Sequence, residues 1–238
     1  MEFINTFKNK INTLHIELNE EQYKQYVTYY EMVVEKNKVM NLTGITEFNE
    51  FIDKHYIDSL SIVNAVDMNQ VNSMIDVGTG AGFPGIPLKI AFPHLKITLL
   101  DSLNKRINFL NEVIDALGLE NVETCHGRAE DFGHRKDYRE KYDLCASRAV
   151  ANLATLSEYC LPFVKIGGQF VSYKSGNVDN ELKESAKAIK ILGGEAGKVC
   201  SFVLPETDFA RTLVPITKVK ATGNKYPRKA GTPSKEPL

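Results

Sequence analysis

The first third of the chain has its apolar residues at three- and four-residue steps. After Asn19, a suitable helix cap, the apolar positions are Tyr23, Tyr26, Val27, Tyr30, Val33 and Val34. This period predicts an amphipathic helix with one buried side. A second predicted helix begins near residues 46–49 and contains His55 and Asp58, which share one face because they lie three residues apart. Residues 1–70 are therefore predicted to be a helical extension packed on the rest of the chain.

The pattern changes at residue 73, where short apolar runs begin to alternate with helical periodicity. Strands are predicted at residues 73–77, 96–100, 122–126, 142–147, 167–174, 201–204 and 213–218. Helices are predicted between them, at residues 86–91, 104–118 and 179–191. Such alternation favours a mainly parallel sheet covered on both faces. The sequence thus predicts a Rossmann-like α/β domain over residues 71–220, with a seven-stranded, mostly parallel sheet.

A glycine-rich loop follows the first predicted strand. Gly78, Gly80 and Gly82 alternate with other residues, and glycine permits positive φ and a close approach of the backbone to a ligand. The second predicted strand ends in Asp101, where a carboxylate is suited to accept both hydroxyls of a ribose. Together the loop and the acid predict an adenosine-bearing ligand.

The glycine loop is compatible with two kinds of ligand, a dinucleotide and S-adenosylmethionine. The spacing Gly80-x-Gly82-x-x-Gly85 matches the dinucleotide fingerprint, which leaves a domain for NAD or FAD open. Asp76 precedes the first glycine, and Pro84 has no backbone N–H for a pyrophosphate. S-adenosylmethionine carries a positive sulfonium and no phosphate, so it suits an acidic strand end better. We therefore interpret the loop as a site for S-adenosylmethionine.

Further candidates follow the third and fourth predicted strands. Because ligands bind beyond the carboxyl ends of parallel strands, Ala129 and Glu130 fall where an adenine would lie. The backbone N–H of Ala129 is a donor and the carboxylate of Glu130 an acceptor for that ring. Arg148 leaves the fourth strand, where it is placed to hold the carboxylate of the donor or to donate to O6 and N7 of a guanine.

Composition and charge limit the partners, metals and cellular location that we expect for the protein. The 238 residues have a formal net charge of -1, so any surface for nucleic acid must be local. The four cysteines are scattered, which predicts neither a zinc site nor a disulfide framework, and no metal is expected. We find no signal-peptide pattern and no apolar run of membrane-spanning length, so the protein is expected in the cytoplasm, without a membrane partner. The tail, residues 221–238, is basic and contains three prolines, which predicts irregular structure that either contacts phosphates or is a disordered solubilising tail.

Three separated stretches form a combination more specific than the glycine loop alone. They are residues 40–43 with 55–59, the loop 76–85, and the tail pattern Arg-Lys-x-Gly-x-Pro-x-Lys-x-Pro-Leu at residues 228–238. From about residue 20 to its end, the chain resembles the bacterial RsmG family, formerly called glucose-inhibited division protein B. The resemblance implies a class I methyltransferase that uses S-adenosylmethionine to modify N7 of one guanine in 16S ribosomal RNA, near the decoding site. It also implies donor contacts at Gly78, Phe83, Ala129, Glu130 and Arg148.

The target atom implied by the resemblance determines the mechanism that we expect. Guanine N7 has an available lone pair, so transfer needs positioning and no general base, and no catalytic residue is assigned. The partner is expected to be 16S rRNA or the small ribosomal subunit, with no obligate protein partner. Predicted substrate-binding residues are His55, Asp58, Lys174, Arg228, Lys229 and Lys235. An NAD-dependent oxidoreductase and a ribosome-assembly factor that binds a nucleotide without turnover remain alternatives.

Overall fold

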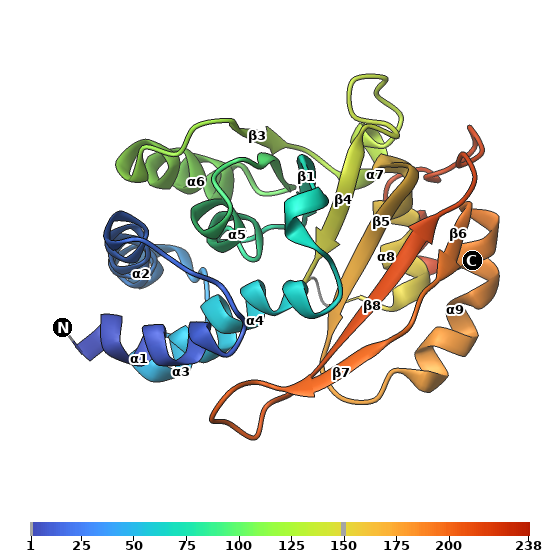
Figure 1. Ribbon diagram of the computed structural model, residues 1–238. Coiled ribbons are helices and arrows are strands. Elements are labelled where there is room, and N and C mark those ends of the chain that lie inside the picture. Colours follow the sequence, from blue (N-terminus) through green and yellow to red (C-terminus); the bar gives the residue numbers. More distant parts are fainter. Residues whose placement is uncertain (1, 149–150) are drawn as a thin grey trace.

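A central sheet of eight strands organises the computed structural model, which describes residues 2–148 and 151–238 (Figure 1). The strand order is β3-β2-β1-β4-β5-β8-β6, and β7 pairs with β8 beside this path. The first five strands are parallel, whereas β8 runs antiparallel to β5, β6 and β7. The strands are β1 (Ser73–Val77), β2 (Lys96–Asp101), β3 (Val122–His126), β4 (Tyr142–Ser147), β5 (Val164–Lys174), β6 (Gly194–Ala196), β7 (Cys200–Val203) and β8 (Ala210–Lys218).

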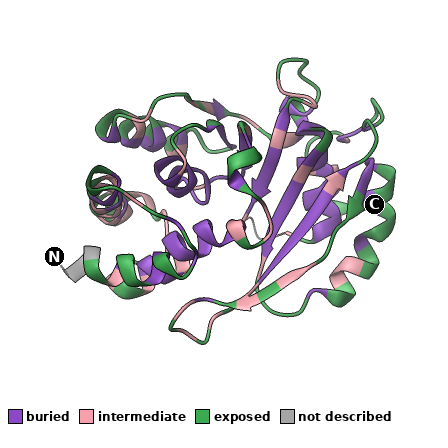
Figure 2. Ribbon diagram, viewed as in Figure 1, coloured by how far each residue is buried: buried purple, intermediate pink, exposed green. Residues whose placement is uncertain are grey.

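Helices cover both faces of this sheet. One face carries α1 (Glu2–Asn12), α2 (Glu20–Met40), α3 (Phe48–Phe51), η1 (Ile52–Ile57), α4 (Asp58–Leu60), α5 (Gly85–Ala91) and α6 (Asn104–Leu117). The other face carries α7 (Ala129–Phe132), α8 (Leu153–Cys160) and α9 (Asp179–Ile191). The alternation of strand side chains divides the core between them: Leu144 points into the first layer and Cys145 into the second. Figure 2 shows that the central strands and α5 are mostly buried, whereas α2, α6 and α9 carry many exposed residues. Shorter elements are η2 (Ser61–Asn64), η3 (Met68–Gln70), η4 (Leu161–Phe163) and α10 (Thr232–Lys235).

The predicted α/β fold is confirmed, with two corrections. The sheet has eight strands instead of seven, because β6 is only three residues long and gives no periodic signal. The tail is not entirely irregular, since Thr232 and Pro233 open the short helix α10 after Gly231. No helix in the described residues is both long and apolar enough to cross a membrane.

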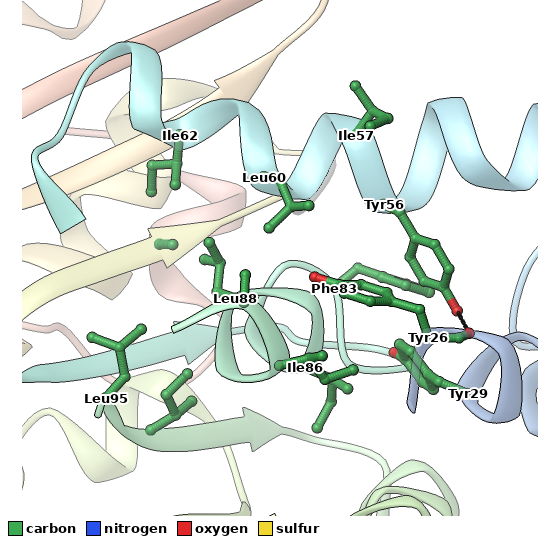
Figure 3. Packing of buried hydrophobic residues seen from close by; sticks show 14 of the residues in the cluster. Tyr26, Tyr29, Tyr56, Ile57, Leu60, Ile62, Phe83, Ile86, Leu88 and Leu95 are labelled. Carbon is green, nitrogen blue, oxygen red and sulfur yellow. Dashed lines mark hydrogen bonds between the residues drawn. The ribbon is translucent and has the colours of Figure 1, made fainter. Parts of the chain in front are cut away.

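The N-terminal helices pack on the sheet through a cluster of aromatic rings. Asn19 caps α2 in a reciprocal capping box with Gln22, as its position predicts. From α2, Tyr26 and Tyr29 meet Tyr56 and Phe83, and the Tyr56 hydroxyl donates to the Tyr26 carbonyl at 2.8 Å (Figure 3). These rings belong to the same hydrophobic core as β1 and β2, so this layer of the core joins residues 2–70 to the sheet. The division into three parts at residues 70 and 220 stays a prediction.

Candidate functional site

A cleft of about 610 Å³ lies over the carboxyl ends of β1, β2, β3 and β4. This is the edge at which parallel sheets of this kind bind ligands. Of the predicted cofactor residues, those that line this cleft are Gly78, Gly80, Asp101, Ala129, Glu130 and Arg148. Leu100 and Leu156 add apolar walls. We call this space the donor cleft.

The glycine loop and the second strand are tied together at this cleft. The Asp101 Oδ2 atom accepts the N–H of Gly80 at 2.9 Å and Nη1 of Arg106 at 3.2 Å. Gly80 has a φ of +63°, and a side chain there would project into open space. A carboxylate has about four acceptor sites, so these bonds orient Asp101 without exhausting it. The geometry therefore fits an adenosine whose ribose lies between the loop and Asp101.

Three predicted cofactor residues support the loop from behind, outside the lining of the donor cleft: Asp76, Gly82 and Phe83. Gly82 has a φ of +110°, and a Cβ atom there would lie 2.7 Å from the Tyr29 hydroxyl. The Asp76 Oδ2 atom accepts Thr79 Oγ1 at 2.7 Å and the Gly85 N–H at 2.9 Å. Burial raises the pKa of Asp76 to about 6 against these two hydrogen bonds. Asp76 and Gly82 thus fix the shape of the loop, and direct donor contacts at these three residues stay predictions.

Arg148 is held by the helical segment that precedes the sheet. Its Nη1 donates to Asp58 Oδ2 at 2.6 Å and to the Lys54 carbonyl at 2.8 Å, and its Nη2 lies 3.2 Å from His55 Nδ1. The guanidinium also lies 5.3 Å from the centre of the Phe83 ring. Arg148 is therefore fixed in place by residues about 90 positions earlier, and is not a free arm at the strand end.

The geometry around His55 determines which of its nitrogens carries the proton. Because an arginine only donates, Nδ1 of His55 must accept from Arg148, which leaves the proton on Nε2. That Nε2–H donates to Thr43 Oγ1 at 2.8 Å. Burial, together with the charges of Arg148 and Lys54, lowers the pKa of His55 to about 3. The ring is neutral, and it stacks on Phe83 with ring centres 4.3 Å apart.

A second cleft of about 700 Å³ adjoins the donor cleft, and Arg148 and Ala151 line both. We call it the acceptor cleft. Lys54, Lys174 and Arg211 also line it, as do His55 and Asp58. The structure therefore brings together three of the predicted substrate-binding residues.

Arg211 was not predicted from the sequence, where it is an isolated cation on a closing strand. Its Nε donates to Asp58 Oδ1 at 2.8 Å, across 153 positions of chain. Asp58 thus lies between two guanidinium groups and balances only one of them, so this cluster retains a positive charge. No local pattern reveals such a pair; only the fold brings these residues together.

The predicted RNA contacts other than His55 and Asp58 differ in position and in pairing. Lys174 lines the acceptor cleft, but its Nζ is bonded to the Ala151 carbonyl at 2.7 Å and to Glu181 at 2.6 Å. Arg228, Lys229 and Lys235 line neither cleft. Arg228 forms an ion pair with a buried carboxylate, whereas the two lysines are exposed. The predicted basic face is therefore divided between the acceptor cleft and the tail.

The fold and the donor cleft define the class of protein. A parallel sheet with one antiparallel strand between β5 and β6, a glycine loop after β1 and an acid at the end of β2 is typical of Rossmann-like methyltransferases. A solved O-methyltransferase from Bacillus cereus in complex with SAH has the same fold, with a TM-score of 0.57 and 15% identity. The match covers 80% of this chain and 91% of that one.

The sequence comparisons give the family. The family described as rRNA small subunit methyltransferase G matches residues 22–210. The chain is 52% identical to the ribosomal RNA small subunit methyltransferase G of Lachnoclostridium phytofermentans, over 98% of this chain and 96% of that protein. It is 50% identical to the protein of that name in Bacillus subtilis, over 99% and 98% of the two chains. The chain belongs to the rRNA small subunit methyltransferase G family, which confirms the resemblance, and it is an S-adenosylmethionine-dependent methyltransferase.

Proposed function

We propose that this enzyme transfers a methyl group from S-adenosylmethionine to N7 of one guanine in 16S ribosomal RNA, near the decoding site. The observation that supports this most directly is that Arg148 and Ala151 line both clefts. A donor in one cleft and a base in the other would meet beside these residues. We further propose that the enzyme works in the cytoplasm, on the small subunit or its RNA.

Methyl transfer to guanine N7 requires little from the protein except that it positions the donor and the base. S-adenosylmethionine supplies a methyl group bound to a sulfonium, which leaves as a neutral thioether. The lone pair of guanine N7 forms the new N–C bond as the C–S bond breaks, and the positive charge moves to the guanine. No proton moves in this step, which agrees with a neutral His55 whose two nitrogens are both engaged. Orientation of the two reactants is worth roughly 7 to 11 kcal/mol in such reactions.

The acceptor cleft supplies the charge needed to hold an RNA strand. The surplus positive charge of Arg148, Asp58 and Arg211 lies at the wall of a cleft whose occupant is a polyanion. Because Asp58 holds the guanidinium of Arg148 in place, the positive charge of Arg148 stays where the two clefts meet. A cation pressed directly on N7 would oppose the charge that develops there, so we place Arg148 on the donor side or at O6.

Transfer of a labelled methyl group tests this function. The substrates are 16S rRNA and intact small subunits, both from cells that lack the protein, followed by borohydride and aniline cleavage of the RNA. We expect cleavage at one guanine. If neither substrate incorporates label although the protein binds S-adenosylmethionine, the rRNA assignment is wrong, and a ribosome-assembly role without turnover replaces it.

A further inference from the structure

The C-terminal segment, residues 226–236, contacts the wall of the donor cleft. The N–H of Gly231 donates to Oε1 of Glu130 at 2.8 Å, and Glu130 lines that cleft. Helix α10 packs on α8, where Thr155 Oγ1 donates to the Pro233 carbonyl at 2.8 Å. Leu156, the next residue of α8, also lines the donor cleft. The segment therefore lies directly behind two parts of the donor wall.

Arg228 anchors this segment on the body of the protein. Its Nη2 lies 2.7 Å from Glu158 Oε2, its Nε lies 2.9 Å from Oε1, and its backbone N–H donates to Oε1 at 2.7 Å. Glu158 is fully buried, so its charge is tolerable only with such a partner. Nη2 of Arg228 also donates to the Glu236 carbonyl at 2.8 Å, which closes the segment on itself. These bonds occupy most of the donors of Arg228.

Two cations of the same segment face solvent. Lys229 follows the anchor directly, and Lys235 ends helix α10. Neither forms an ion pair within the described residues. They are therefore available to RNA phosphates, while the segment that carries them fixes Glu130.

We propose that residues 226–236 are a structural part of the donor site, with Arg228 and Gly231 as positioning residues for Glu130. RNA phosphates on Lys229 and Lys235 hold the segment in place, so that RNA and donor strengthen each other's binding. By linkage, the factor is the same in both directions. This inference rests on the proposed function, since it assigns the donor to the cleft beside Glu130 and RNA to the tail.

The first test is calorimetric titration of the full chain with S-adenosylmethionine, with and without 16S rRNA. We expect Arg228→Met to weaken donor binding about tenfold without RNA, the size expected when the bond from Gly231 to the Glu130 carboxylate is lost. Lys187→Met, which removes an exposed cation from α9, is the matched control and should bind the donor like the wild type. The double variant Lys229→Met/Lys235→Met should bind the donor normally without RNA but lose the increase that RNA produces in the wild type.

A double-mutant cycle separates positioning from general destabilisation. If the segment acts through Glu130, Arg228→Met should have little further effect on donor affinity in a Glu130→Ala background. Arg228→Lys should restore part of the loss. Thr155→Val provides a second, milder variant if Arg228→Met does not fold, because it removes only the bond to the Pro233 carbonyl.

The outcomes distinguish this inference from the proposed function. If the wild type does not bind S-adenosylmethionine, the proposed function fails. If the wild type binds it and Arg228→Met and Thr155→Val bind it equally well, the segment has no part in the donor site. Additive effects in the cycle would likewise overturn the role assigned to Glu130, and equal binding with and without RNA would overturn the coupling.

Discussion

The two ends of the chain support the two clefts by different physical means. The N-terminal segment, residues 2–70, is bound to the sheet by fully buried rings, among them Phe7, Tyr26 and Tyr56. The C-terminal segment, residues 226–236, contributes one buried ring, Tyr226, to the second layer of the core, and it is otherwise held by the Arg228–Glu158 ion pair and by single hydrogen bonds such as Gly231 to Glu130. One end shares the hydrophobic core through many buried rings, whereas the other depends mostly on polar contacts.

This difference separates stability from binding. Removal of a buried ring leaves a cavity in the folded protein. Such changes in the N-terminal segment should therefore lower the free energy of unfolding. The bonds from Gly231 to Glu130 and from Thr155 to the Pro233 carbonyl are single hydrogen bonds, so loss of one of them should loosen this part of the segment without unfolding the sheet.

Phe7→Ala should have the largest effect on stability. The ring is fully buried and lies 4.7 Å from the ring of Tyr26 and 5.6 Å from that of Tyr56. We expect a loss of about 3 to 5 kcal/mol in the free energy of unfolding, measured by urea denaturation. Lys8→Ala, an exposed neighbour on α1, is the control and should change it by less than about 0.5 kcal/mol. A loss below about 1 kcal/mol for Phe7→Ala would contradict a shared core.

Asp58→Asn should combine a smaller loss of stability with a large loss of activity. The carboxylate bonds to both Arg148 and Arg211, and a neutral amide leaves the two cations facing each other. Loss of such charged hydrogen bonds is expected to lower the free energy of unfolding by about 2 kcal/mol. Methyl transfer should fall further than donor affinity, because Asp58 and Arg211 line the acceptor cleft alone, whereas the donor cleft is disturbed only through Arg148. Full turnover in this variant would show that Asp58 does not position Arg148.

The sequence predicted the donor cleft better than the acceptor cleft. Asp101 ends β2 and Gly80 lies in the loop after β1, so periodicity and spacing alone place them at one edge of a parallel sheet. The pairing of Arg211 with Asp58 depends on an antiparallel strand meeting a helix 153 positions earlier, and no local pattern encodes such a contact. The π-helical turn Ile52–Ile57, which carries His55, was also not predicted, because its composition does not differ from that of an α-helix.

Two residues, His55 and Asp76, should make opposite contributions to the pH dependence of the free energy of unfolding. The pKa of His55 is about 3 in the folded protein, against an ordinary value of 6.5. Between these values the unfolded chain holds a proton that the folded chain lacks, so His55 makes stability fall as the pH drops. Asp76 has its pKa raised from 3.8 to about 6, so it makes stability fall as the pH rises through that window. From about pH 4 to pH 6 the two contributions therefore cancel.

Single substitutions should expose each of these contributions. In Asp76→Asn the His55 contribution remains, and stability should fall by about 1.4 kcal/mol more per pH unit on acidification than in the wild type between pH 6 and pH 4. In His55→Asn the slope should change by the same amount in the opposite direction. Urea denaturation at a series of pH values measures both. Parallel curves for the three proteins would mean that neither group titrates differently in the folded state.

Lys229→Met/Lys235→Met should have the smallest effect on stability, and should change only RNA binding and the coupling of RNA to the donor. Both side chains are exposed and form no ion pair in the described part of the chain, so the free energy of unfolding should stay within about 0.5 kcal/mol of the wild type. Each lost phosphate contact should reduce the slope of log affinity against log salt by about 0.7 for single-stranded RNA, or about 1.4 for both. RNA binding measured over a salt series tests this, with Lys187→Met as the control. An unchanged slope would leave the acceptor cleft as the source of RNA affinity and limit the tail to its contact with Glu130.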